Sequence, residues 1–182
     1  MRVIAGTARS LRLKTPEGSD TRPTTDRIKE TLFNMLQPYL YDAVFVDLFS
    51  GSGGIGIEAL SRGARHAYFA ENEKHAIACI RENLQFTRMA DRATLLQTDA
   101  VSALYGIHEK AADIIFMDPP YDCGHERRVL EALRNIPYVT KDTLIVIETS
   151  LKTDLSYLEE TGFSLEKEKV YKTNRHIFCR KA

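Results

Sequence analysis

A glycine-rich loop directly after a short apolar segment limits the folds that this chain can adopt. Residues 44–49 read Val-Phe-Val-Asp-Leu-Phe, a β-branched and aromatic run typical of a buried strand. The loop at 50–56 follows, and then Ile57, Leu60 and Ala64 recur at helical spacing. A strand, a glycine loop and a helix in this order predict a site where a ligand meets backbone N–H groups at a helix N-terminus.

The glycines of this loop fit the dinucleotide pattern G-x-G-x-x-G, but the charges beside them favour a different ligand. Gly51, Gly53 and Gly56 make the match. Asp47 closes the predicted strand and Glu58 falls in the first turn of the predicted helix, so carboxylates flank the place that a pyrophosphate would take. These charges would repel a dianion and attract the ammonium and sulfonium of S-adenosylmethionine (SAM). We therefore expect SAM here, with a dinucleotide or an unliganded glycine turn as the alternatives.

Apolar segments that end in polar residues alternate with helical patterns along the rest of the chain. Further strands are predicted at 67–71, 93–97, 112–118 and 144–148, a closing antiparallel pair at 165–170 and 177–180, and helices from Asp26 to a stop at Pro38, through 76–84 and at 129–136. This alternation predicts an α/β fold with a doubly wound, mostly parallel, seven-stranded sheet. Ligands bind such sheets at the carboxyl ends of strands beside the switch point, so the strands ending at Asp47 and Asp118 are expected to be neighbours.

The composition predicts one domain spanning residues 1–182. A length of 182 residues with 43% hydrophobic content is enough to bury a substantial core. Residues 1–40 are expected to form an N-terminal extension, a short hairpin at 3–5 and 11–13 followed by a helix. No apolar run approaches the ~20 residues of a membrane helix, and the three cysteines are scattered without zinc-ligand spacing. We expect a monomeric, cytoplasmic protein without a metal.

The second informative stretch is Asp118-Pro119-Pro120-Tyr121, directly after a predicted buried strand. The two prolines fix φ and remove two backbone donors, so the turn is rigid and presents mainly acceptors. Asp118 and the carbonyl of Pro119 can therefore converge on a group rich in N–H. Tyr121 can offer a flat face for stacking. If this turn faces the glycine loop, the two stretches together predict a site where a cofactor meets a planar amine.

Two further acids follow predicted strands at the same edge. Glu71 lies ~20 residues beyond Gly51, the offset at which a carboxylate accepts hydrogen bonds from ribose hydroxyls. Because SAM and NAD share that ribose, Glu71 does not distinguish them. Asp99 follows the third strand. It could accept from an adenine amino group or cap the helix after it, and the sequence leaves both open.

The net charge is zero, but basic residues gather at both ends of the chain. Residues 1–15 carry four basic side chains and residues 169–181 six, counting a histidine, with no acid in either stretch: Arg2, Arg9, Arg12 and Lys14, then Lys169, Lys172, Arg175, His176, Arg180 and Lys181. Such ends on a neutral body predict a phosphate-binding rim. Solvated charges on surface strands are the alternative.

The motifs together resemble a known family. The segment 47–56 with 118–121 resembles class I SAM-dependent methyltransferases that modify exocyclic nitrogens of bases. With residues 22–34, Arg-Pro-Thr-Thr-Asp-Arg-Ile-Lys-Glu-Thr-Leu-Phe-Asn, the whole chain resembles the RsmD family, which methylates N2 of one guanine, guanine 966 in the usual numbering, of bacterial 16S rRNA.

The resemblance implies a set of site residues. SAM contacts are expected at Asp47, Phe49, Ser50, Gly51, Ser52, Gly53, Gly56, Glu71, Asn72, Asp99, Ala100 and Asp118, the base is expected at Asp118, Pro119, Pro120 and Tyr121, and RNA contacts at Arg2, Arg9, Arg12, Arg22, Thr24 and Arg27. For the cluster at 22–27, helix capping is the alternative. The implied partner is 16S rRNA, within the small ribosomal subunit or an assembly intermediate.

Three rival functions are also compatible with parts of the sequence. A DNA adenine-N6 methyltransferase shares the turn at 118–121, although the chain has no room for a separate target-recognition domain. A non-catalytic SAM- or RNA-binding assembly factor would not need that turn intact. An NAD oxidoreductase would share the glycine loop. A cysteine-dependent C5 methyltransferase is disfavoured because tyrosine, not cysteine, follows Pro120.

Overall fold

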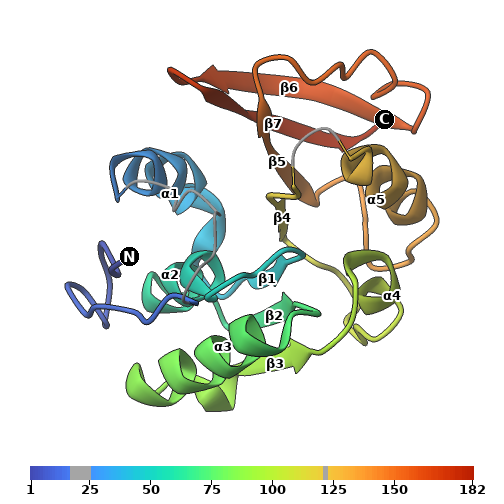
Figure 1. The fold of residues 1–182 in the computed structure, drawn as a ribbon. Helices are drawn as coiled ribbons and strands as arrows, with labels where there is room; N and C mark the ends of the chain where they lie inside the picture. The colour runs from blue at the N-terminus through green and yellow to red at the C-terminus, as the bar shows by residue number, and fades with distance from the viewer. Residues whose placement is uncertain (17–25, 121–122) are drawn as a thin grey trace.

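The computed structural model describes residues 1–16, 26–120 and 123–182. Seven strands form one sheet in the order β3-β2-β1-β4-β5-β7-β6 (Figure 1). Their bounds are β1 Val44–Asp47, β2 His66–Ala70, β3 Ala93–Leu96, β4 Ile114–Met117, β5 Leu144–Ser150, β6 Phe163–Val170 and β7 Asn174–Lys181. The first five are parallel, and β7 runs antiparallel to both β5 and β6. The predicted doubly wound, mostly parallel sheet is confirmed.

Helices cover both faces of the sheet. They are α1 Asp26–Leu40, α2 Gly54–Ser61, α3 Lys74–Phe86, α4 Ala100–Leu104 and α5 His125–Leu133, with a 3-10 turn at Ala90–Arg92. Side chains alternate between faces along a strand: Phe45 packs with α1, α2 and α3, whereas Val44 and Val46 pack with α4 and α5. No helix in the described ranges is long and apolar enough to cross a membrane.

Two local expectations were wrong in detail. Helix α1 does not stop at Pro38 but continues to Leu40. Pro38 lies in the last turn, where it deletes only one intrahelical bond, and the full burial of Leu36 and Leu40 holds that turn against the core. Helix α5 begins at His125, four residues before the predicted start at 129.

The predicted N-terminal hairpin is reduced to one antiparallel bridge, between Arg2 and Arg12. The chain reverses through Gly6, with φ of 83°, and Ser10, with φ of 70°. These left-handed conformations make a compact turn that leaves little room for regular pairing. Residues 1–16, hereafter the N-terminal segment, therefore pack mainly as an irregular strap (Figure 1).

Candidate active site

The strands that end at the two motifs are neighbours, as predicted. β1 pairs with β4 in parallel, with Asp47 opposite Phe116, and the N–H of Leu48 donates to the carbonyl of Phe116 at 3.0 Å. The chain order reverses between these two strands. The glycine loop and Asp118 consequently emerge at the same edge of the sheet, which is where ligands bind in open α/β folds.

The glycines are required by the shape of this loop. Gly53 is the N-cap of α2 and has φ of 81°, a left-handed conformation that side chains disfavour. Gly56 faces the ring of Phe69 on β2, and a Cβ there would lie 2.3 Å from Cε1 of that ring. The loop therefore folds tightly between β1 and β2, and its backbone approaches the ligand edge of the sheet.

Asp47 is buried at the base of the loop, with 1% of its surface exposed. Its Oδ2 accepts from the N–H of Gly56 at 3.2 Å, while Oδ1 has no hydrogen-bond partner among the described residues. Burial raises its pKa to about 7, the Gly56 N–H opposes that rise, and the charge of Glu71 adds to it. An unsatisfied buried carboxylate oxygen favours a cationic N–H donor over an anion at this position.

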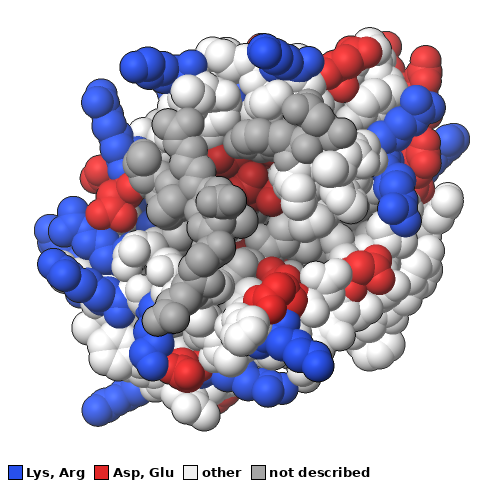
Figure 2. Space-filling view, in the orientation of Figure 1, with Lys and Arg blue, Asp and Glu red and all other residues white. Residues whose placement is uncertain are grey.

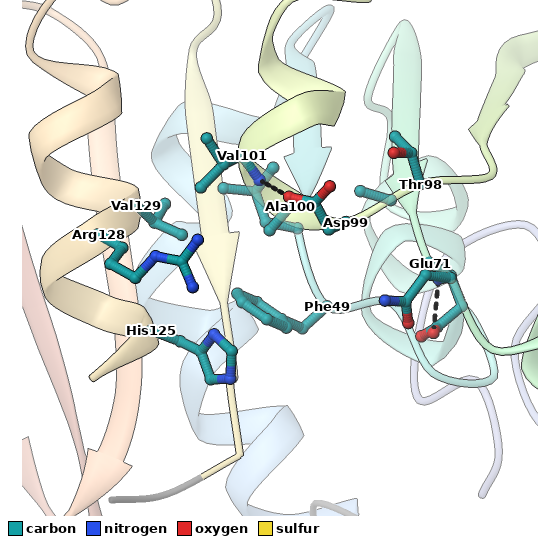
Figure 3. A pocket seen from close by; sticks show the side chains of 12 residues that line it. Phe49, Glu71, Thr98, Asp99, Ala100, Val101, His125, Arg128 and Val129 are labelled. Carbon is teal, nitrogen blue, oxygen red and sulfur yellow. Dashed lines mark hydrogen bonds between the residues drawn. The ribbon is translucent and has the colours of Figure 1, made fainter. Parts of the chain in front are cut away.

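A cavity of about 160 Å³ opens beside the loop (Figure 3). It is lined by Leu48, Phe49, Ala70, Glu71, Asn72, Thr98, Asp99, Ala100, Val101, His125, Arg128 and Val129. Five predicted cofactor residues are thus brought together from the ends of β1, β2 and β3: Phe49, Glu71, Asn72, Asp99 and Ala100. The other predicted cofactor residues do not line this cavity and lie in the adjacent loop and at the strand ends: Asp47, Ser50, Gly51, Ser52, Gly53, Gly56 and Asp118.

Glu71 is held in place by backbone donors. Its Oε2 accepts from the N–H of Gly51 at 2.8 Å, and Oε1 accepts from the N–H groups of Asn72 and Glu73, both at 2.9 Å. These hydrogen bonds connect the glycine loop to the end of β2, beside the cavity. A carboxylate oxygen has further lone pairs, so Glu71 keeps acceptor capacity toward the cavity.

Asp99 caps a helix, which is one of the two roles the sequence left open, and its contact with an adenine amino group stays a prediction. It is the N-cap of α4, and its Oδ1 accepts from the N–H groups of Val101 and Ser102, each at 3.1 Å. It also lines the cavity (Figure 3). The Ser102 side chain and the capped N–H groups lower its pKa, so the cap keeps this wall of the cavity anionic.

Helix α5 supplies a wall that sequence reasoning missed. His125 and Arg128 lie across the cavity from Asp99, and the His125 ring packs edge-on against Phe49 with centroids 6.0 Å apart (Figure 3). No motif marks these residues. The only available signal was their position within ten residues of the turn at 118–121. Thr98 and Val101 were missed in the same way.

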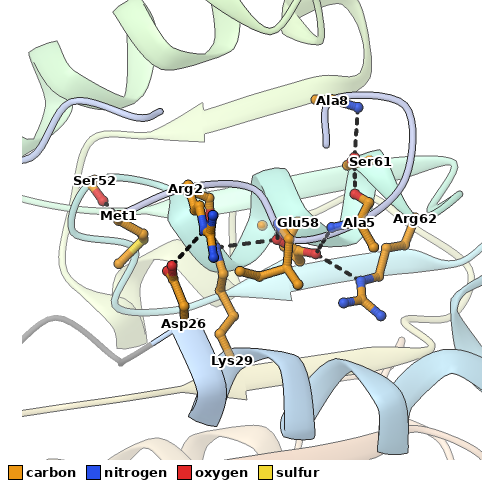
Figure 4. A network of polar contacts seen from close by, with 12 residues as sticks. Met1, Arg2, Ala5, Ala8, Asp26, Lys29, Ser52, Glu58, Ser61 and Arg62 are labelled. Atoms are coloured by element: carbon orange, nitrogen blue, oxygen red, sulfur yellow. Dashed lines mark hydrogen bonds and ion pairs between the residues drawn. The ribbon is translucent and has the colours of Figure 1, made fainter. Parts of the chain in front are cut away.

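Glu58 was misplaced by the sequence argument. It is the fifth residue of α2 and fully buried, and its carboxylate faces α1 and the N-terminal segment (Figure 4). It accepts from the N–H groups of Ile4 and Ala5 at 2.8 and 3.0 Å. It also pairs with Arg62 at 2.8 Å and with Lys29 at 3.3 Å. Asp47 and Glu71, not Glu58, therefore give the ligand edge its acidic character.

Asp118 follows β4 and lies among other acids. Desolvation raises its pKa well above the usual range, and the charges of Glu148, Asp47 and Glu126 add to that rise. Pro119 is buried and Pro120 exposed, while Tyr121 lies outside the described residues. On the face of the molecule drawn in Figure 2, acidic side chains lie in a hollow near the centre, and basic side chains lie at the periphery.

Four of the predicted RNA contacts are exposed: Arg2, Arg9, Arg12 and Arg27. Arg2 also pairs with Asp26 at 2.7 Å. Arg22 and Thr24 lie outside the described residues.

The basic C-terminal stretch fits the expected rim only in part. His176 is fully buried against Glu148, and Arg175 and Arg180 pair with Glu168 and Glu166. Lys169 and Lys172 are exposed, so a role of these two in binding phosphate stays a prediction.

Across residues 1–16, 26–120 and 123–182, no group of three or more histidine, cysteine or acidic side chains has the arrangement of a metal site.

The strand order and the ligand edge between β1 and β4 define a class I methyltransferase fold. Two solved structures share it: a putative methyltransferase, yhhF, from Escherichia coli, with a TM-score of 0.85 and 33% identity over 100% of this chain and 97% of that one, and a putative methylase from Haemophilus influenzae, with a TM-score of 0.81 and 29% identity over 100% and 98%.

The chain belongs to the family described as Conserved hypothetical protein 95, whose model matches residues 1–180, and this is the RsmD family of the sequence resemblance. It is 35% identical to Ribosomal RNA small subunit methyltransferase D of Escherichia coli over 93% of this chain and 84% of that protein. It is 38% identical to the putative rRNA methyltransferase YlbH of Bacillus subtilis over 85% of each chain. The protein is a methyltransferase.

Proposed function

We propose that this methyltransferase transfers a methyl group from SAM to the exocyclic N2 of one guanine, guanine 966, of 16S rRNA. The observation that carries the proposal is the pairing of two acids on neighbouring strands. Asp47, with its unsatisfied buried oxygen, ends β1, and Asp118 follows β4. The names of the relatives support rRNA as the substrate class.

The residues present fit SAM. The orphaned Oδ1 of Asp47 suits the ammonium of the methionine part. Glu71 keeps acceptor capacity for ribose hydroxyls, and Asp99 and Phe49 line the cavity where an adenine would lie. A dinucleotide pyrophosphate would lie beside the carboxylates of Asp47 and Glu71, whose charges repel it. SAM, when bound, supplies an electrophilic methyl group.

The acceptors at the β4 end then activate the amine. The guanine amino group is a weak nucleophile because its lone pair is delocalised into the ring. Asp118 and the Pro119 carbonyl accept its hydrogens and turn the lone pair toward the methyl group. As nitrogen gains the methyl, it loses one proton to Asp118. The carboxylate also suits the N1–H of guanine, which adenine lacks, and Tyr121 is proposed to stack on the base.

The N-terminal segment is proposed to bind the RNA backbone. Arg9 and Arg12 are exposed on it, and Arg27 is exposed at the start of α1. Asn83 of α3 accepts from the N–H of Lys14 at 2.8 Å and donates to the carbonyl of Ser52 at 2.9 Å. One side chain thus connects the N-terminal segment to the glycine loop, which supports a shared position for the proposed RNA and SAM contacts. The same proposal places the enzyme with ribosomal subunits in the cytoplasm.

The experiment offers radiolabelled SAM with unmodified 16S rRNA, small subunits and duplex DNA, and identifies the methylated nucleoside. N2-methylguanosine from rRNA or subunits is expected for the wild type. Asp118→Asn should lower kcat by about 100-fold or more and leave SAM affinity within about twofold. Asp91→Asn, on the exposed 3-10 turn, is the matched control. N6-methyladenine from DNA, or an equally large loss of SAM affinity in Asp118→Asn, contradicts the assignment.

The RNA surface is tested with a double variant. Arg9→Ala with Arg12→Ala removes two exposed cations, so rRNA affinity should fall and the slope of log affinity against log salt should decrease by about 1 to 2. SAM affinity, measured by calorimetry, should not change. An unaltered salt slope would show that the phosphates lie elsewhere.

A further inference from the structure

A buried polar network lies behind Asp118, where β5 pairs with β7. Glu148, Asn174 and His176 are 4%, 6% and 0% exposed. Asn174 Nδ2 donates to Glu148 Oε1 at 2.6 Å, and His176 Nε2 lies 2.9 Å from Glu148 Oε2. The other ring nitrogen, Nδ1, lies 3.1 Å from the hydroxyl of Tyr171. Both oxygens of Glu148 are thus fixed from β7.

The sheet register places Glu148 beside Asp118. Met117, the last residue of β4, lies opposite Ile147 of β5, so Asp118 leaves β4 at the level where Glu148 continues β5. Glu148 lies on the same face of β5 as Val146, which packs with α1. After desolvation, the charge of Glu148 is the largest influence on the pKa of Asp118, ahead of Asp47 from β1 and Glu126 from α5.

The hydrogen bonds are compatible with one assignment of the protons in this network. Burial and the charge of Glu148 raise the pKa of Tyr171 to about 12, so its hydroxyl keeps its proton at neutral pH. If the Tyr171 hydroxyl donates to Nδ1 of His176, the ring proton of a neutral imidazole lies on Nε2 and faces Glu148. In that arrangement the two oxygens of Glu148 accept from two uncharged donors, Asn174 and His176.

A purely structural role explains this network poorly. Apolar side chains at these three positions would pack in a sheet interior without the cost of burying a charge. The network also leaves acceptor capacity unused, since Asn174 Oδ1 has no partner among the described residues. Buried charge held next to a reactive carboxylate is instead typical of functional sites.

We propose that Glu148 is a positioning residue whose charge, fixed by Asn174 and His176, makes Asp118 a stronger acceptor for the proton of the reacting amine. The inference rests on the proposed function. In the step concerned, the sulfur–methyl bond breaks and its electron pair stays on sulfur. A nitrogen–methyl bond forms from the amine lone pair, and the N–H proton passes to Asp118. Glu148 takes no atom and acts only through Asp118.

The test is the pH profile of Glu148→Gln, with methyl transfer to rRNA as the readout. Removing the neighbouring charge lowers the pKa of Asp118, so the acidic limb of kcat/KM should move to lower pH by about one unit. The plateau at high pH should fall, because a carboxylate of lower pKa accepts a proton less well. SAM affinity should stay within about twofold. Activity that is higher than in the wild type at low pH and lower at high pH is not expected from simple loss of structure.

Glu126→Gln is the matched control. Glu126 is a buried carboxylate that also influences Asp118, but it lies on α5 and outside the β7 network. Its variant should move the acidic limb by less than Glu148→Gln does. An unshifted profile in Glu148→Gln, or an equal shift in both variants, overturns the proposal.

A second measurement uses the wild type and does not depend on the variant folding. Nitrogen NMR of histidine-labelled protein should show His176 neutral and protonated at Nε2 at neutral pH. An imidazolium would cancel the charge of Glu148, and an Nδ1–H tautomer would not donate to it, so either result overturns the proposal. Failure of the proposed function is distinguishable, because the wild type would then yield no N2-methylguanosine.

Discussion

Glu58→Gln should strongly destabilise the fold where α2 packs against α1 and the N-terminal segment. The substitution keeps the side chain's volume but removes the charge that offsets Lys29 and Arg62, whose side chains are 0% and 5% exposed. Burial already lowers the pKa of Lys29, and Glu58 opposes that shift. Breaking a buried pair from one side costs about 3 to 5 kcal/mol, because the remaining charge is buried and uncompensated.

This loss of stability should affect the N-terminal segment first. Glu58 accepts from the N–H groups of Ile4 and Ala5, and Ser61 on the same helix accepts from the N–H of Ala8 at 3.0 Å (Figure 4). Weakening the first anchor should free the N-terminal segment before the rest of the chain unfolds. Tryptic cleavage after Arg9 and Arg12 should then be faster than in the wild type.

The assay is urea unfolding with a calorimetric check, and about 2 to 4 °C per kcal/mol at this chain length predicts a fall of about 6 to 20 °C in Tm. Glu131→Gln is the control, since Glu131 forms an i,i+4 pair with Arg127 at 3.0 Å with both side chains about half exposed. That pair is worth less than about 1 kcal/mol. Adding Lys29→Met to Glu58→Gln should restore part of the stability. A loss in Glu58→Gln no larger than in the control would refute the reasoning.

Two further predictions concern the glycine loop. The pKa of Asp47 is about 7 in the folded state and 3.8 ordinarily, so its stabilising contribution is complete below pH ~4 and is lost as pH rises through 7, about 4 kcal/mol in all. The stability advantage of Asp47→Asn over the wild type should therefore be larger at pH 8 than at pH 5, and the variant should bind SAM more weakly. Equal differences at both pH values would contradict this. Gly56→Ala places a methyl 2.3 Å from Phe69 and should cost about 1 to 3 kcal/mol in urea unfolding, whereas Gly106→Ala, with its nearest neighbours at 3.4 Å, should cost less.

Local patterns predicted the elements of this protein well. The apolar run at 44–47, the glycines after it and the helical spacing from Ile57 each depend on neighbours within a few residues, and β1, the loop and α2 formed as expected. The strand that precedes Asp118 was predicted from the same kind of local pattern. A general rule for doubly wound sheets predicted that this strand and β1 are neighbours, so the ligand edge was predictable as well.

Contacts between distant segments were not predictable. Glu58 looked like a ligand-facing acid because its position in the helix says nothing about which side faces α1. His176 looked like a surface cation because the stretch around it is basic, and only its pairing with β5 buries it against Glu148. His125 and Arg128 reach the cavity because α5 begins earlier than its apolar spacing indicated.

The class of fold, the glycine loop and the two acids at the ligand edge of the sheet could be predicted from the amino-acid sequence, because these follow from local periodicity and from residue types with few alternative uses. Which charges face that edge and which face each other depended on tertiary contacts. A carboxylate's role depends on its desolvation and on partners brought by other strands and helices. Glu58 and Glu148 acquire those partners only when the chain closes over the sheet.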